Sequence, residues 1–81
     1  MVSGTVGALD WPSATEIVIQ QIGLPASQAR RLEDSGEGIF LVDQDPSQAR
    51  VVRRMYLPGS GLQPDIVIFV DEETLAVVGI E

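Results

Sequence analysis

Few residue types in this chain could do chemistry, because it contains no histidine, cysteine or lysine. Their absence excludes Ser-His and Cys-His nucleophile pairs, Ser-Lys dyads, Schiff-base lysines, the usual zinc ligands and the lysine of a phosphate-binding loop. Only the carboxylates, Tyr56 and the arginines could transfer protons. No isolated pair of carboxylates stands in an apolar stretch of the sequence, so we expect a protein that is not an enzyme and has no catalytic residues.

One acidic segment matches the beginning of a calcium-binding loop. Asp43, Asp45 and Ser47 have the spacing of its first three ligands. However, Gln48 stands where such a loop requires glycine, and Arg54 stands where it requires a bidentate glutamate. We therefore predict no metal site and no cofactor.

The charges are unevenly distributed along the chain. Twelve acidic residues and five arginines give a net charge of −7, and all the arginines lie between Arg30 and Arg54. A negative field of this size argues against a nucleic-acid partner and would steer a basic protein toward the chain. The segment that holds the arginines is either a binding surface or one solvated face of a sheet.

The length of the chain predicts a single domain, residues 1–81. Residues 1–10 are small and weakly alternating, and we expect them to form a flexible tail or an edge strand. The N-terminus lacks the basic and long apolar regions of a signal peptide, and no apolar run approaches the roughly 20 residues of a membrane span. Together with the absence of cysteine, these features predict a soluble, cytoplasmic protein with no membrane partner.

Two helices are expected in the N-terminal half. Ser13 and Glu16 have the spacing of a capping box, which predicts a helix over 13–22 that Gly23 would end. A proline suits the first turn of a second helix, which we predict over 25–34.

The rest of the chain predicts four strands. Residues 66–70 are five consecutive apolar residues between two aspartates, which is typical of a buried central strand. The other predicted strands are 39–42, 49–57 and 75–80. Short connections favour pairing between neighbours, above all between 66–70 and 75–80.

These elements predict an α+β fold, with one or two N-terminal helices packed on a small, mainly antiparallel four-stranded sheet. Two short helices would leave part of the apolar runs uncovered. A homodimer formed through an edge strand would then complete the core.

The end of the 49–57 strand carries residue types that are favoured at interaction hot spots, namely Arg53, Arg54 and Tyr56. We expect them to form an exposed aromatic-arginine surface that continues into the following loop, over 57–63. The predicted partner-binding residues of this loop are Leu57, Pro58, Gly59, Ser60, Gly61 and Leu62. The resulting hypothesis is a small acidic module that binds another protein.

A second hypothesis comes from a resemblance. The order of Trp11-Pro12, a capped helix, a loop, and a strand ending in Val70-Asp71 resembles the potato inhibitor I family of serine-protease inhibitors. The resemblance implies that 57–63 is a protease-binding loop. The chain departs from the family pattern because residues 65–70 supply no arginine to brace the loop. The loop is also shorter, and it lacks the threonine and acidic residue of the family's scissile bond.

A third hypothesis concerns nucleic acid. Residues 20–33 are similar to the turn and second helix of winged helix-turn-helix regulators, with Arg30 and Arg31 on the recognition helix. The hairpin over 39–57, which carries the other three arginines, would be the wing. This resemblance implies nucleic-acid binding through 22–54, which the net charge opposes.

Overall fold

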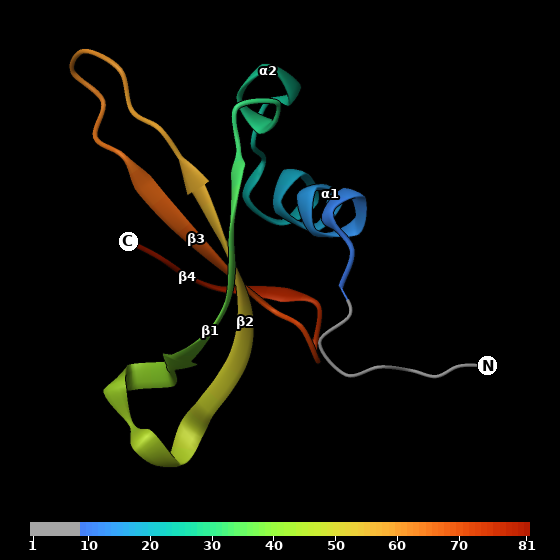
Figure 1. Ribbon diagram of the computed structural model, residues 1–81, viewed down its shortest axis with the longest axis vertical. Helices are drawn as coiled ribbons and strands as arrows, with labels where there is room; N and C mark the ends of the chain where they lie inside the picture. The colour runs from blue at the N-terminus through green and yellow to red at the C-terminus, as the bar shows by residue number, and fades with distance from the viewer. Residues whose placement is uncertain (1–8) are drawn as a thin grey trace.

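The computed structural model describes residues 9–81, which form a sheet with helices on one of its faces (Figure 1). In chain order the elements are α1 (Trp11–Ile22), α2 (Ala26–Ala29), β1 (Glu33–Leu41), the 3-10 turns η1 (Val42–Gln44) and η2 (Pro46–Gln48), β2 (Ala49–Leu57), β3 (Ile66–Asp71) and β4 (Ala76–Ile80). The strands form an antiparallel sheet in the order β1-β2-β3-β4. The predicted α+β class and the pairing of the last two strands are confirmed. The prediction of a tail or edge strand over 1–10 falls mainly on residues outside the described ones.

Helix α1 begins earlier than the sequence predicts. Asp10 is the N-cap residue, with extended backbone at φ −75° and ψ 159°. Pro12 lies in the first turn, where its missing N–H costs nothing because first-turn N–H groups have no helical partner. The predicted N-cap at Ser13 is therefore wrong, since Ser13 lies inside the first turn. Gly23 ends the helix in the left-handed conformation, at φ 68°, as predicted.

Helix α2 is a single turn, so the prediction of a helix over 25–34 is wrong for most of that range. Leu32 is buried in the core, and the next residue, Glu33, pairs with Tyr56 of β2. Burial and strand pairing thus override the local helical preference of this segment. The two arginines that follow α2 lie in a turn, and not on a recognition helix.

Strand β1 is a long, irregular edge strand that begins well before the predicted 39–42. Its register with β2 shifts between Asp34 and Glu37, where Gly36 has a φ of 83°. A left-handed residue in a bulge suits glycine, which has no Cβ to clash. Gly36 therefore lies at a bulge within a strand, whereas the predicted helix over 25–34 would have placed it just after a helix. Beyond the bulge the ladder is regular from Glu37 to Leu41.

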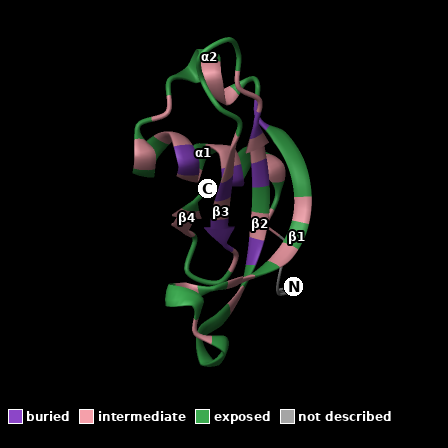
Figure 2. Ribbon diagram, turned by 90° about the vertical axis from the view of Figure 1, so that its left-hand side faces the viewer, coloured by how far each residue is buried: buried purple, intermediate pink, exposed green. Residues whose placement is uncertain are grey.

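The main core lies between the helices and one face of the sheet (Figure 2). Antiparallel register places the core residues of β2 and β3 on the same face, as in the pair Met55 and Ile68. The buried residues of this core are Ala14, Val18, Leu32, Met55, Leu57, Ile68 and Val70. Full burial of an aliphatic side chain contributes roughly 1.5–3 kcal/mol, so this layer is the main stabilising contact of the fold.

The opposite face carries an aromatic pair. The ring centroids of Phe40 on β1 and Phe69 on β3 are 4.9 Å apart. A Cβ placed on Gly79 would lie 2.7 Å from Cζ of Phe40, and one on Gly38 would lie 3.0 Å from Nε of Arg54. The two glycines thus allow larger side chains to lie flat against the sheet.

The two edges of the sheet differ. At β4, the side-chain amide of Gln21 accepts a hydrogen bond from the N–H of Val77 at 2.8 Å and donates one to the carbonyl of Leu75 at 3.0 Å. Helix α1 therefore satisfies backbone groups of this edge. At the other edge, within residues 9–81, β1 pairs only with β2.

Candidate protein-binding surface

The loop between β2 and β3 is held in shape by the carboxylate of Asp65. The hydroxyl of Tyr56 donates a hydrogen bond to Oδ2 of Asp65 at 2.7 Å, and the N–H of Gly59 donates one to Oδ1 at 2.6 Å. The hydrogen bond from Tyr56 and that from Gly59 lower the pKa of Asp65, and the same contact with Asp65 raises the pKa of Tyr56. One side chain thereby ties the start of the loop to its end.

The tip of this loop is a tight turn from Ser60 to Gln63. The N–H of Gln63 donates a hydrogen bond to the carbonyl of Ser60 at 2.9 Å, and Gly61 takes up a φ of 57°. Below the turn the two arms are in contact, because a Cβ on Gly59 would lie 2.1 Å from the carbonyl oxygen of Gln63. The turn leaves Leu62 fully exposed at the tip.

An arginine from outside the loop also braces it. Nη2 of Arg31 donates a hydrogen bond to the carbonyl of Pro58 at 2.9 Å. This contact could not be predicted from the sequence, because Arg31 follows α2 and is 27 residues from Pro58 along the chain. Leu57, at the base of the loop, is buried in the core, so its side chain supports the loop from the core side.

The expected aromatic-arginine surface is divided between the two faces of the sheet. Arg53 points to the helical side, where its side chain is 16% exposed and Nη1 lies 2.6 Å from Oδ2 of Asp34. Arg54 lies on the opposite face and donates hydrogen bonds to the carbonyls of Ser35 and Glu37, at 3.0 and 3.3 Å. Only Arg54 shares a face with Tyr56, so the three predicted hot-spot residues do not form one surface.

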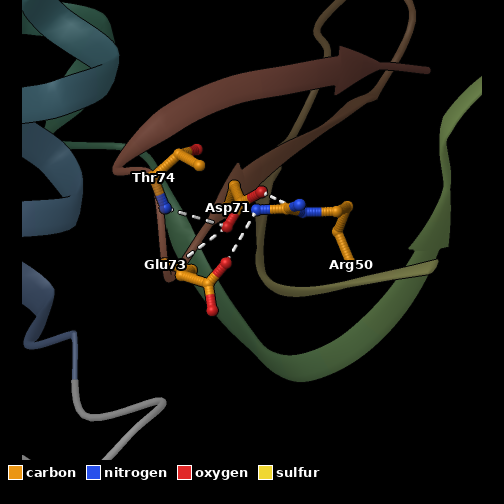
Figure 3. Close-up of polar contacts among 4 residues, drawn as sticks. All are labelled: Arg50, Asp71, Glu73 and Thr74. Carbon is orange, nitrogen blue, oxygen red and sulfur yellow. Dashed lines mark hydrogen bonds and ion pairs between the residues drawn. The ribbon is translucent and has the colours of Figure 1, made fainter. Parts of the chain in front are cut away.

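A second polar cluster joins β2 to the turn between β3 and β4 (Figure 3). Asp71 is 2% exposed, and its Oδ2 accepts a hydrogen bond from Nε of Arg50 at 2.6 Å. Its Oδ1 accepts from the N–H groups of Glu73 and Thr74, at 2.8 and 3.1 Å. Burial disfavours the charged form, but the contact with Arg50 and the two N–H groups outweigh it, so the pKa of Asp71 is lowered.

This cluster lines an open pocket of about 380 Å³, which Val42, Ser47 and Val78 also line. A further contact of Arg50, from Nη2 to Oε1 of Glu73 at 3.2 Å, completes an ion-pair triad. Because its charged groups are engaged with one another, the cluster fastens the β3–β4 turn to β2. The acidic run after residue 70 was visible in the sequence, but its arginine partner was not.

A pair of carboxylates lies on the helical side of the sheet, near Arg53. Both carboxylate oxygens of Glu72 are buried and have no hydrogen-bond partner within residues 9–81. Burial raises the pKa of Glu72, and the neighbouring carboxyl group of Glu37 raises it further. No group of three or more residues with metal-ligating side chains converges in the described part of the chain.

Comparison of the chain with protein-family models, with curated proteins and with solved structures finds no significant match. No helix among residues 9–81 is long and apolar enough to cross a membrane.

Proposed function

We propose that this chain is a small, acidic, non-enzymatic module that binds another protein through the β2–β3 loop. The observation that carries the proposal is the position of Leu62, which is fully exposed at the tip of a loop that Asp65 and Arg31 hold in place. We propose that Leu62 enters an apolar pocket of the partner. The neighbouring contact residues are Pro58, Gly59, Ser60 and Gly61.

The contacts of Asp65 and Arg31 with the loop matter because a flexible loop would have to become ordered when the partner binds. Ordering costs roughly 0.5–1.5 kcal/mol for each flexible side chain that becomes fixed, so a loop that is ordered in advance binds more tightly for the same contacts. The net charge of −7 would draw a basic partner toward the module and raise the association rate. A cytoplasmic location remains a prediction, as does the absence of enzymatic activity.

The experiment that tests this proposal is affinity capture with three forms of the protein: wild type, Leu62→Ser and Ile80→Ser. Ile80 is the matched control, because it is an exposed aliphatic residue, at 49%, on a different element. We expect capture of one protein by wild type and by Ile80→Ser, at both low and high salt, and a loss of at least tenfold with Leu62→Ser. Equal capture by all three forms would reject the loop as the binding surface.

A second candidate function uses the same loop. The contact between Arg31 and the carbonyl of Pro58 supplies an arginine brace of the kind that the resemblance to potato inhibitor I proteins calls for, although from a different element. The closed turn from Ser60 to Gln63 weighs against this candidate. Inhibition of subtilisin or chymotrypsin, with slow cleavage of the loop, would support it. Rapid cleavage after Tyr56 or Leu57 without inhibition would reject it.

A further inference from the structure

Within residues 9–81, the outer edge of β1 has no neighbouring strand along its regular part, from Glu37 to Leu41. In the described sheet β1 is the first strand and pairs on one side only. Alternate N–H and C=O groups of an edge strand lack strand partners and can accept another strand. The β4 edge is partly protected, because the side-chain amide of Gln21 forms hydrogen bonds with the backbone at Leu75 and Val77.

Between Glu37 and Asp43, the side chains of this edge lack two of the features that usually protect an edge strand, namely charges and prolines. Natural edge strands are protected by charges, prolines, short length or β-bulges. Strand β1 has a bulge just before Glu37, but residues 38–41 beyond it contain no charge and no proline. Ile39 is 64% exposed and Leu41 is 39% exposed, both on the helical side of the sheet beyond the helices. Phe40 points to the other side. An added strand would therefore meet apolar side chains on both faces.

The charges around the edge indicate which strand would fit. Glu37 lies at one end of the regular segment, and Asp43 is exposed just beyond the other end. The arginines of β2 opposite and beside this segment are engaged within the chain. Arg50 pairs with Asp71 and Glu73, Arg53 pairs with Asp34, and Arg54 binds two carbonyls of the bulge. A second copy would bring another net charge of −7 to an edge with acidic ends. A basic strand would instead be attracted.

We propose that Glu37–Leu41 is a strand-addition site for an extended segment of a basic partner protein, in which Lys or Arg flanks an alternating apolar core. Such a segment would extend the sheet by one strand, with its cations opposite Glu37 and Asp43 and its apolar residues opposite Ile39 and Leu41. Backbone pairing would supply affinity, and the side chains would supply specificity. This surface and the β2–β3 loop lie at opposite ends of the sheet (Figure 1), so the proposal does not depend on the loop.

The test uses a defined probe, the peptide acetyl-Lys-Thr-Val-Thr-Val-Thr-Lys-amide, together with the same peptide carrying Glu in place of Lys. Two-dimensional NMR of the wild-type protein, titrated with each peptide, locates the contact directly. We expect the basic peptide to shift the backbone resonances of Glu37–Leu41 and to slow hydrogen exchange at alternate amides of β1. We expect the acidic peptide to bind at least tenfold more weakly.

Two matched variants complete the test. Ile39→Lys places a cation on the open edge and should weaken binding of the basic peptide at least tenfold. Ile80→Lys, on the opposite edge, should bind the peptide as wild type does. Ile39 is 64% exposed and Ile80 is 49% exposed, so both variants should fold. Shifts confined to residues 58–64, or equal binding by the two variants, would overturn the proposal. So would slow exchange of β1 amides in the free protein, because the chain itself or a second copy would then already cover the edge.

Discussion

The side-chain amide of Gln21 on α1 accepts a hydrogen bond from the backbone N–H of Val77 at 2.8 Å, although the two residues are 56 positions apart. The same amide donates to the carbonyl of Leu75 at 3.0 Å. An amide side chain carries both a donor and an acceptor, as a backbone peptide group does. Gln21 thus couples the first helix to the last strand.

Replacing Gln21 by Ala should lower the free energy of unfolding by about 1–2 kcal/mol, because two backbone groups lose their partners. Urea denaturation measures the change. The matched control is Gln20→Ala on the same helix, where the amide donates only to the exposed Glu16 at 2.9 Å. That variant should change stability by less than about 0.5 kcal/mol. Equal losses in the two variants would show that the bonds to β4 contribute nothing.

The fold was predictable from sequence wherever a local pattern decides the structure. The bounds of β2 match the predicted 49–57, and the apolar run 66–70 forms most of β3. Both strands are marked by short local patterns, which are the alternation of side chains in β2 and the uninterrupted apolar residues in β3. The segment 25–34 was not predictable in the same way. Its helical spacing is real, but the burial of Leu32 and the pairing of Glu33 with β2 depend on residues far along the chain.

The candidate site was predictable in part, for the same reason. Prolines and glycines mark the β2–β3 loop in the sequence, since they favour turns. Its braces come from Arg31 and Asp65, and the contact from Arg31 depends on the packing of the segment after α2, where the neighbouring Leu32 is buried in the core. The acceptors of Arg54 likewise exist only because β1 has a bulge at Gly36. Contacts between residues that are far apart along the chain leave no local sequence pattern from which they could be predicted.

The buried carboxylate of Asp71 should be a main source of acid sensitivity. Asp71→Asn keeps an acceptor for the N–H groups of the turn but loses the charge that binds Arg50. We expect a loss of about 2 kcal/mol at pH 7, within the range for hydrogen bonds to charged groups. The exposed Asp43 provides a control, since Asp43→Asn should have little effect. Because the pKa of Asp71 is lowered, its contribution is present above the ordinary carboxyl pKa and disappears as the pH falls through the folded-state value.

Urea denaturation at a series of pH values checks this prediction. The difference between wild type and Asp71→Asn should be largest near neutral pH and should shrink in acid. A difference that does not change with pH would mean that the loss comes from altered packing of the turn.

The carboxyl pair of Glu37 and Glu72 should affect the pH dependence of stability in the opposite direction to Asp71. The pKa of Glu72 is raised, so the folded state holds the proton more tightly than the unfolded state. Its favourable contribution is therefore present at low pH and is lost as the pH rises through the folded-state pKa. Glu72→Gln imitates the protonated form and should raise the free energy of unfolding at pH 7, by up to about 1 kcal/mol.

Glu37→Gln should stabilise the protein similarly, and the double variant should gain little over either single variant, because each change removes the same repulsion. Glu33→Gln, on the same strand as Glu37, serves as the control and should change stability by less than about 0.5 kcal/mol. Full additivity of the two changes, or a loss of stability in Glu72→Gln at pH 7, would contradict the interpretation.

The brace from Asp65 should control the order of the β2–β3 loop. Asp65→Ala removes the acceptor of both Tyr56 and Gly59, so the loop should be cleaved faster by a protease of broad specificity. Mass spectrometry of the fragments would place the new cuts near Leu62. Tyr56→Phe removes one of the two contacts, so its loop should be cleaved at a rate between those of wild type and Asp65→Ala. Unchanged cleavage in both variants would show that the turn from Ser60 to Gln63 is ordered without Asp65.

The contact between Gly79 and Phe40 offers a test of the uncovered face of the sheet. A Cβ on Gly79 would lie 2.7 Å from Cζ of Phe40, so Gly79→Ala should force the ring away from Phe69. Overpacking of this kind costs about 1–3 kcal/mol. In a Phe40→Ala background the methyl group has room, and Gly79→Ala should then cost much less. A double-mutant cycle in urea measures this difference, which is the coupling between the two positions. A coupling near zero would mean that the ring swings into solvent at no cost and that the aromatic pair does not stabilise the sheet.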